Sequence, residues 1–103
     1  MLDEIVLYID IDGTITQEPF MHFLDYNKST PNVQVINKIN LLYEKGYKVI
    51  LYTSRFTIDN KVTREWLLKY NVKFHDIIFD KPRGSYFIDD KNLTITEFLE
   101  KEF

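Results

Sequence analysis

The stretch IVLYIDIDGT, residues 5–14, joins an apolar strand pattern to two acidic residues. Residues 5–9 are β-branched or large and apolar, a composition typical of a strand that is covered on both faces. Asp10 and Asp12 then interrupt the apolar pattern just before Gly13. Because burying a carboxylate costs several kcal/mol unless a partner compensates it, two such residues this close together need an explanation.

The composition predicts one ordered domain over residues 1–103. The 103 residues are 45% hydrophobic and 16% aromatic, which is enough to form a core. The net charge of -3 argues against a nucleic-acid partner held on a broad basic face, but it permits a small phosphorylated ligand. Since the chain has no cysteine, it can form neither disulfides nor a thiolate metal site, and a reducing cytosol suits it.

The N-terminal residues favour a cytoplasmic protein with no membrane partner. No basic residue precedes the first apolar run, and that run is short and ends in acids. We therefore expect neither a signal peptide nor a membrane span.

The apolar pattern predicts alternating strands and helices. After the opening strand, three further strands are predicted, at 47–55, 75–80 and 85–90. Helices are predicted at 29–46, 57–71 and 94–103. This order predicts the α/β class, as a Rossmann-like three-layer α/β/α sandwich with helices on both faces of a mostly parallel sheet.

Local signals indicate where two of the helices begin and end. Ser29 or Thr30 can cap the first helix, Pro31 suits its first turn, and Gly46 favours its end. For the last helix, Thr94 or Thr96 can serve as the cap.

Polar residues follow every predicted strand, and in parallel sheets ligands bind outside the carboxyl ends of the strands. Four acids would then lie close together, which is costly without a cation. An oxygen-only cluster of this kind suits Mg²⁺. The residues expected at this edge are Asp10, Asp12, Thr53, Ser54, Arg55, Lys81, Asp89 and Asp90.

Four short motifs resemble, in order, those of the haloacid dehalogenase (HAD) superfamily of phosphohydrolases. They are DIDGT at 10–14, VILYTSR at 49–55, Lys81 in DKP, and the acidic pair in YFIDDK. The short interval between Asp12 and Thr53 leaves little room for a cap domain. The resemblance therefore implies a HAD-like, capless phosphatase, similar in length to small phosphatases encoded with capsule or surface-polysaccharide genes.

The resemblance also implies a role for each motif residue. Asp10 would form an aspartyl phosphate, and Asp12 would act as general acid and base. Thr53 would hydrogen-bond the transferring phosphoryl group, and Lys81 would neutralise charge. The implied Mg²⁺ ligands are Asp10, Asp12 (through its backbone carbonyl), Asp89 and Asp90, and the candidate substrate-binding residues are Gly13, Thr14, Ser54 and Arg55.

The expected function is Mg²⁺-dependent hydrolysis of a small phosphomonoester, such as a sugar phosphate, in polysaccharide biosynthesis. The chemistry suits these residues. Phosphoryl transfer requires mainly positioning and cations, and a carboxylate nucleophile divides the displacement into two steps. A second carboxyl group can protonate the leaving oxygen.

Three other functions use similar residues or a similar fold. A response-regulator receiver domain uses similar residues but places its acidic pair first, so the motif order excludes it. A nucleic-acid end phosphatase or nucleotidase fits an uncapped site, although nucleic acid suits the charge poorly. A non-catalytic HAD-fold binding or regulatory module is the third alternative.

The sequence alone allows two roles for several residues. Arg55 and Arg83 are either solvated surface groups or substrate ligands. Phe20, Met21 and Phe23 either line the active-site mouth or pack in the core. Because a capless site excludes water poorly, we also expect a homo-oligomer with residues 20–23 near a contact.

Overall fold

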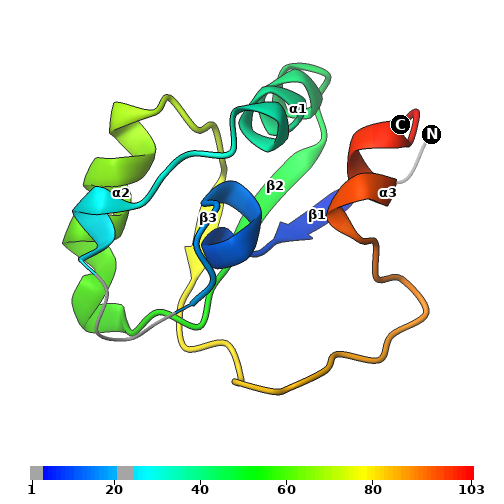
Figure 1. Cartoon of the computed structure of the whole chain (residues 1–103). Coiled ribbons are helices and arrows are strands. Elements are labelled where there is room, and N and C mark those ends of the chain that lie inside the picture. The colour runs from blue at the N-terminus through cyan, green and yellow to red at the C-terminus, as the bar shows by residue number, and fades with distance from the viewer. Residues whose placement is uncertain (1–3, 21–24) are drawn as a thin grey trace.

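The computed structural model describes residues 4–20 and 25–103, which alternate strands with helices (Figure 1). The strands are β1 (Val6–Ile9), β2 (Lys48–Tyr52) and β3 (Asp76–Ile78), and the α-helices are α1 (Val33–Glu44), α2 (Asn60–Lys69) and α3 (Ile95–Glu100). Shorter turns are η1 (Ile11–Ile15), η2 (Tyr26–Lys28) and η3 (Thr57–Asp59). None of the helices in these residues combines the length and the apolar character needed to cross a membrane.

The three strands form one parallel sheet in the order β1-β2-β3. Ile9 pairs with Leu51, and Leu51 pairs with Ile77, so the carboxyl ends of all three strands lie at the same edge. A helix lies in each crossover, which is what joining parallel neighbours requires. The predicted α/β class and parallel sheet are confirmed, and the fold is consistent with a Rossmann-like arrangement.

The hydrophobic core lies on one face of this sheet. Strand side chains alternate between faces, and the residues of the three strands that face the core are buried between the sheet and the apolar stripes of α1 and α2. Helix α3 contacts α1 and packs its own apolar residues against the same core. The buried set is Ile9, Ile11, Ile15, Val35, Ile36, Ile39, Val49, Leu51, Trp66, Leu67, Val72 and Ile77.

On the opposite face of the sheet the edge strands are open, whereas Ile50 in the central strand β2 is buried. Tyr8 in β1 is 61% exposed and Ile78 in β3 is 41% exposed. All three α-helices of the described residues contribute to the single core, so a second helical layer is not formed by this part of the chain. The expectation that helices cover both faces is therefore not met within residues 4–20 and 25–103.

The strand expected at 85–90 is wrong for this structure. Residues 79–94 run as a long excursion away from the sheet, drawn in yellow and orange in Figure 1. Its first residues bond to the loop after β2, through the N–H groups of Asp80 and Lys81 and the guanidinium of Arg83. Beyond Arg83 the segment joins no ladder among the described residues, and its polar contacts are local: the side-chain amide of Asn92 donates to the Phe87 carbonyl at 2.7 Å. Ile88 is consequently 99% exposed.

The helix caps are confirmed at two positions and corrected at one. Gly46 adopts a φ of 93° just after α1, and Thr94 caps α3 in a capping box with Glu97. Helix α1, however, is capped by Asn32 and not by Ser29 or Thr30. Thr30 is engaged elsewhere, because its N–H and hydroxyl donate to the Glu18 carboxylate at 2.8 and 2.7 Å.

Candidate active site

The two aspartates that follow β1 are held by a tight backbone turn. Asp12 (φ -74°, ψ 129°) and Gly13 (φ 78°, ψ 2°) have the angles of a type II β-turn, whose third position requires positive φ and therefore favours glycine. The Thr16 N–H closes the wider turn η1 by donating to the Ile11 carbonyl at 2.9 Å. The Gly13 N–H donates to the Thr16 hydroxyl at 3.2 Å. These bonds fix the backbone that carries both carboxylates.

Residues from all three strand ends surround one cavity of about 340 Å³. Asp10 and Asp12 follow β1, Ser54 follows β2, and Lys81 follows β3. Such a volume is at the lower end of the range for small-molecule sites. The remaining lining residues are Phe20, Pro82, Arg83, Gly84 and Phe87.

Backbone hydrogen bonds join the loops after β2 and β3 and so position Lys81. The Thr53 N–H donates to the Ile78 carbonyl, and the Lys81 N–H donates to the Thr53 carbonyl, both at 2.9 Å. Between them, the Asp80 N–H donates to the Arg55 carbonyl at 2.9 Å, with Asp80 at a φ of 62°. The lysine is thereby fixed beside the end of β1.

Arg55 is the buried partner of Asp12. Its Nε and Nη2 donate to the two carboxylate oxygens of Asp12 at 2.9 and 2.7 Å, a bidentate pair. Its Nη1 donates to the Thr63 hydroxyl of α2 at 3.1 Å, and its guanidinium lies 3.7 Å from the centre of the Tyr26 ring. The prediction that Arg55 is a solvated surface residue is therefore wrong. Its guanidinium points to Asp12 rather than into the cavity.

The ion pair accounts for one of the two adjacent carboxylates. The side chain of Arg55 is fully buried and that of Asp12 is 2% exposed. A buried pair is tolerated only when its geometry is good and its remaining donors are satisfied. Here the Thr63 hydroxyl accepts from the remaining Arg55 nitrogen, Nη1. Asp12 is thus compensated by a protein cation, where the sequence pattern had suggested a metal.

Asp10 is in a different electrostatic environment. Partial burial raises the pKa of Asp10 above its ordinary value of 3.8, and the nearby Asp12 charge adds to this effect. The positive charges of Lys81 and Arg55 and a hydrogen bond from the Ile11 backbone lower the pKa of Asp10 and partly offset the rise. Asp10 is therefore the incompletely compensated acid that faces the cavity.

The support beneath Asp12 includes two residues that the sequence pattern did not single out. Thr63 lies on the buried side of α2, where the helix period offered a signal for its burial but none for its partner. Tyr26 is the first residue of η2, between η1 and α1. Burial, followed by the Asp12 charge, raises the pKa of Tyr26, and its hydroxyl finds no partner among the described residues.

Asp89 and Asp90 are not brought to this cavity. Both are exposed in the 79–94 excursion, and one Asp89 oxygen accepts from the Lys91 N–H at 2.9 Å. That hydrogen bond lowers the pKa of Asp89. Within residues 4–20 and 25–103, no three acidic or histidine side chains come together as metal ligands. The expected four-acid cluster is not assembled, because the strand that would carry the second pair is absent.

Three other candidate residues also lie outside the cavity lining. Thr53 is fully buried, and its hydroxyl accepts from the Arg55 N–H at 3.1 Å. Gly13 lines a different cavity, and Thr14 lines neither. Met21 and Phe23 fall outside the described residues. Phe20 lines the cavity, which agrees with the prediction that it lies at the mouth of the site.

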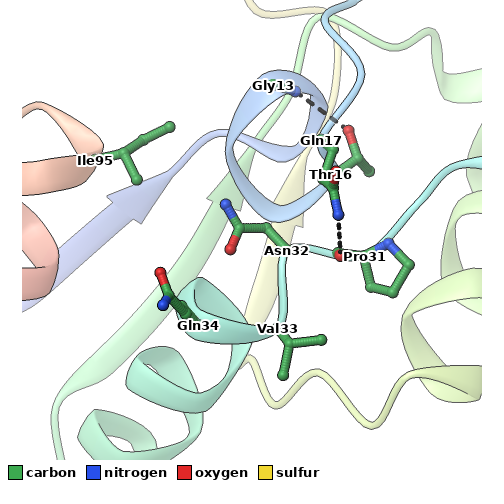
Figure 2. A pocket seen from close by; sticks show the side chains of 8 residues that line it. All are labelled: Gly13, Thr16, Gln17, Pro31, Asn32, Val33, Gln34 and Ile95. Atoms are coloured by element: carbon green, nitrogen blue, oxygen red, sulfur yellow. Dashed lines mark hydrogen bonds between the residues drawn. The ribbon is translucent and has the colours of Figure 1, made fainter.

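A larger cavity, of about 540 Å³, lies on the other side of the turn, between α1 and α3 (Figure 2). Asn32, Val33 and Gln34 approach it from the start of α1, and Ile95 approaches from α3. The Gln17 side-chain amide crosses one wall and donates to the Pro31 carbonyl at 3.1 Å. None of its eight lining residues carries a charge, so it lacks the groups that acid–base or phosphate chemistry needs.

Comparison with solved structures places the fold among known ones. The crystal structure of a target protein from Vibrio cholerae is 26% identical and superimposes with a TM-score of 0.84, covering 95% of this chain and 89% of that one. Two chains of the Pnkp1/Rnl/Hen1 RNA repair complex are 21% and 19% identical, with TM-scores of 0.67 and 0.65. The comparison covers 84% and 94% of this chain but only 31% and 30% of theirs. No protein-family model and no curated protein matches the chain.

Proposed function

We propose that the protein is a phosphomonoesterase of the haloacid dehalogenase type, with Asp10 as its nucleophile. The observation that carries this proposal is the cavity at the strand ends, where Asp10 faces Lys81 while Arg55 holds Asp12 beside it. The order of the four motifs supports it. The hollow between α1 and α3 offers no comparable set of groups.

The proposed reaction has two displacements at phosphorus. A carboxylate oxygen of Asp10 attacks the phosphorus, and the bond to the ester oxygen breaks. For this step one Asp12 oxygen leaves Arg55 and takes up a proton from solvent, which the Asp12 carboxyl group then gives to the ester oxygen. Asp12 then takes a proton from water, whose oxygen attacks the phosphorus of the aspartyl phosphate. Inorganic phosphate leaves, and Asp10 is regenerated.

The other residues of the proposal position the phosphoryl group and neutralise its charge. The Lys81 ammonium is placed against the equatorial oxygens, which carry most of the charge in the transition state. The Thr53 hydroxyl accepts from Arg55, which leaves its own hydrogen free to donate. The Ser54 backbone lies at the rim, where its carbonyl accepts from Arg83 at 2.6 Å. Arg55 acts through Asp12 by holding both of its oxygens.

The proposal includes Mg²⁺ as a cofactor. An acid that lines a cavity and is incompletely compensated suits this ion, which is commonly bound through one or two carboxylates together with water and phosphate oxygens. Asp10, through its carboxylate, and Asp12, through its backbone carbonyl, would hold the ion. When bound, it would supply positive charge that stabilises the phosphoryl oxygens.

Asp89 and Asp90 enter the proposal through a rearrangement of the 79–94 excursion. One edge of β1 pairs with β2, and the other edge pairs with no strand of residues 4–20 and 25–103. A strand formed by 85–90 in parallel with β1 would end beside Asp10, at the edge where the other strands end. Ile88 and Tyr86, at 99% and 87% exposure, would lose exposed apolar surface in this arrangement.

The substrate is proposed to be a small phosphorylated metabolite, and phosphatase action on a nucleic-acid end is the second candidate. The second candidate is favoured by the likeness to chains of an RNA repair complex, although that likeness concerns the fold. The net charge of -3 favours the small molecule. A homo-oligomer covering the open mouth and a role in polysaccharide biosynthesis stay part of the proposal, and sedimentation velocity would measure the former.

Hydrolysis of p-nitrophenyl phosphate, followed by absorbance, tests the proposed function. We expect activity with Mg²⁺, its loss on exhaustive chelation, and its return when Mg²⁺ is restored. Full activity after chelation would remove the ion from the proposal. Absence of activity under all metal conditions, in a protein folded by circular dichroism, would favour the non-catalytic binding module.

A further inference from the structure

The mouth of the Asp10 cavity carries cations that are paired with aromatic rings. The Arg83 guanidinium lies 4.2 Å from the ring centre of Phe56 and 5.2 Å from that of Phe20. The Lys81 ammonium lies 4.6 Å from the ring centre of Phe87. Phe20, Lys81, Arg83 and Phe87 all line the cavity, and Phe56 adjoins it through Arg83. We refer to these five residues as the aromatic rim.

The rim is exposed rather than part of the core. Phe56 is 42% exposed and Phe87 is 51% exposed, and neither belongs to the buried cluster beneath the sheet. The Arg83 guanidinium is held in place by its bond to the Ser54 carbonyl, which leaves a flat cationic group at the mouth. A planar guanidinium beside partly exposed aromatic rings provides surfaces on which a flat ring can stack.

A phosphate group alone would use only part of this arrangement. Its charge is met by Lys81, one of the two basic residues that line the cavity, and Arg83 and the rings remain for another group. The rings offer nothing to phosphate, but they suit a nucleobase, which stacks on aromatic side chains and on guanidinium planes. Because the cavity holds about 340 Å³ and the chain has a net charge of -3, the ligand is small rather than a long polyanion.

We infer that the preferred substrate is a nucleoside monophosphate. Its phosphate would lie between Asp10 and Lys81, and its base would stack at Phe87 and Arg83. This inference rests on the proposed function, since it identifies the substrate class of the same site. The proposed substrate is thus a sugar phosphate that also carries a nucleobase.

Binding measured by calorimetry separates the two ligand classes. The Asp10→Asn variant, which cannot form the aspartyl phosphate, is titrated with adenosine 5′-monophosphate and with ribose 5-phosphate without added metal, so that residues 79–94 keep the conformation in which Phe87 lines the cavity. The ligands share the phosphate and the sugar and differ in the base. Base stacking on aromatic side chains predicts that the nucleotide binds about 5- to 150-fold more tightly. Equal affinities would overturn the inference.

Neighbouring variants show whether the rim causes the difference. Phe87→Leu keeps an apolar side chain but removes the ring, so the preference for the nucleotide should fall toward one. Tyr86→Leu is the matched control, because Tyr86 is 87% exposed in the same segment and does not line the cavity. It should keep the full preference. A loss of preference in both variants, or in neither, would contradict the assignment to the rim.

The wild-type enzyme separates failure of this inference from failure of the proposed function. If both ligands are hydrolysed with the same kcat/KM, the proposed phosphatase function stands and the base-binding role of the aromatic rim is refuted. Hydrolysis of neither ligand would refute the proposed function, and the binding ratio would still decide whether the rim recognises a base.

Discussion

Each of the two aspartates after β1 is compensated in its own way. Asp12 is buried and bidentately paired with Arg55, whereas Asp10 faces a cavity with Lys81 nearby. The alternation of strand side chains puts residues two apart on one side, but it does not determine what each will meet. The environment separates two identical side chains into an acid held by an arginine and an acid that lines a cavity.

The Arg55 pair makes a prediction about stability. Arg55→Ala leaves the Asp12 carboxylate buried without its cation, and breaking a buried pair in this way costs roughly 3–5 kcal/mol. The free energy of unfolding in urea should fall by that amount. Arg64→Ala is the control, because Arg64 is exposed and bonds only to Asn60 of its own helix among the described residues; its effect should stay below about 0.5 kcal/mol. Equal losses in the two variants would show that the pair contributes little.

Asp10 makes a prediction about pH. Because burial raises the pKa of Asp10 in the folded protein, its ionised form destabilises the fold at pH values above the ordinary 3.8. Asp10→Asn should therefore have a higher Tm than the wild type at neutral pH without metal. The advantage should disappear as the pH falls below 3.8, where the wild-type acid is protonated. Asp90→Asn, at an exposed acid, should show no such advantage. A lower Tm for Asp10→Asn at neutral pH would contradict this sign.

At the scale of elements, strands with buried neighbours were predictable and the exposed segment was not. The apolar runs ending near Ile9, Tyr52 and Ile78 form the sheet, because each contributes alternate residues to a shared core. The run at 85–90 also contains aromatic and β-branched residues, but it pairs with no strand among the described residues. Composition reports the capacity to form a strand, whereas the partner that completes the ladder is a tertiary property.

For the site, the sequence predicted which residues gather at the sheet edge but not how their side chains pair. Chain order and the rule for parallel sheets were enough to bring Asp10, Asp12, Ser54 and Lys81 to one edge. The pairing of Arg55 with Asp12, and its support by Thr63 and Tyr26, could not be read from the sequence. A side-chain direction after a strand end depends on neighbours that are distant in sequence.

The rearrangement proposed for residues 79–94 is testable through the metal. If Asp89 and Asp90 complete the Mg²⁺ site, Asp89→Asn and Asp90→Asn should raise the Mg²⁺ concentration needed for half-maximal activity by roughly tenfold or more. Without metal, their Tm should match that of the wild type, because both acids are exposed. Glu100→Gln, at an exposed acid in α3, is the control. Unchanged Mg²⁺ dependence in both aspartate variants would exclude these acids from the site.

At the scale of the molecule, one sheet edge concentrates the charged groups. The strand-end cavity contains two acids and two bases, while the larger cavity between α1 and α3 contains none. The core lies on one side of the sheet, so the strand ends remain accessible. The fold thus leaves Asp10 at an open edge, where a substrate can reach it without passing through the core.

The central claim, that Asp10 becomes phosphorylated, is tested most directly by intact-mass spectrometry of the Asp12→Ala variant. An aryl phosphate needs little help from a proton donor, so this variant should still be phosphorylated, while loss of the general base slows the second step by about 10²–10⁴-fold. We predict that the variant accumulates one phosphoryl group, which peptide mapping places on Asp10, and that Asp10→Asn shows neither adduct nor turnover. A phosphoryl group on another residue, or turnover that persists in Asp10→Asn, would contradict the account.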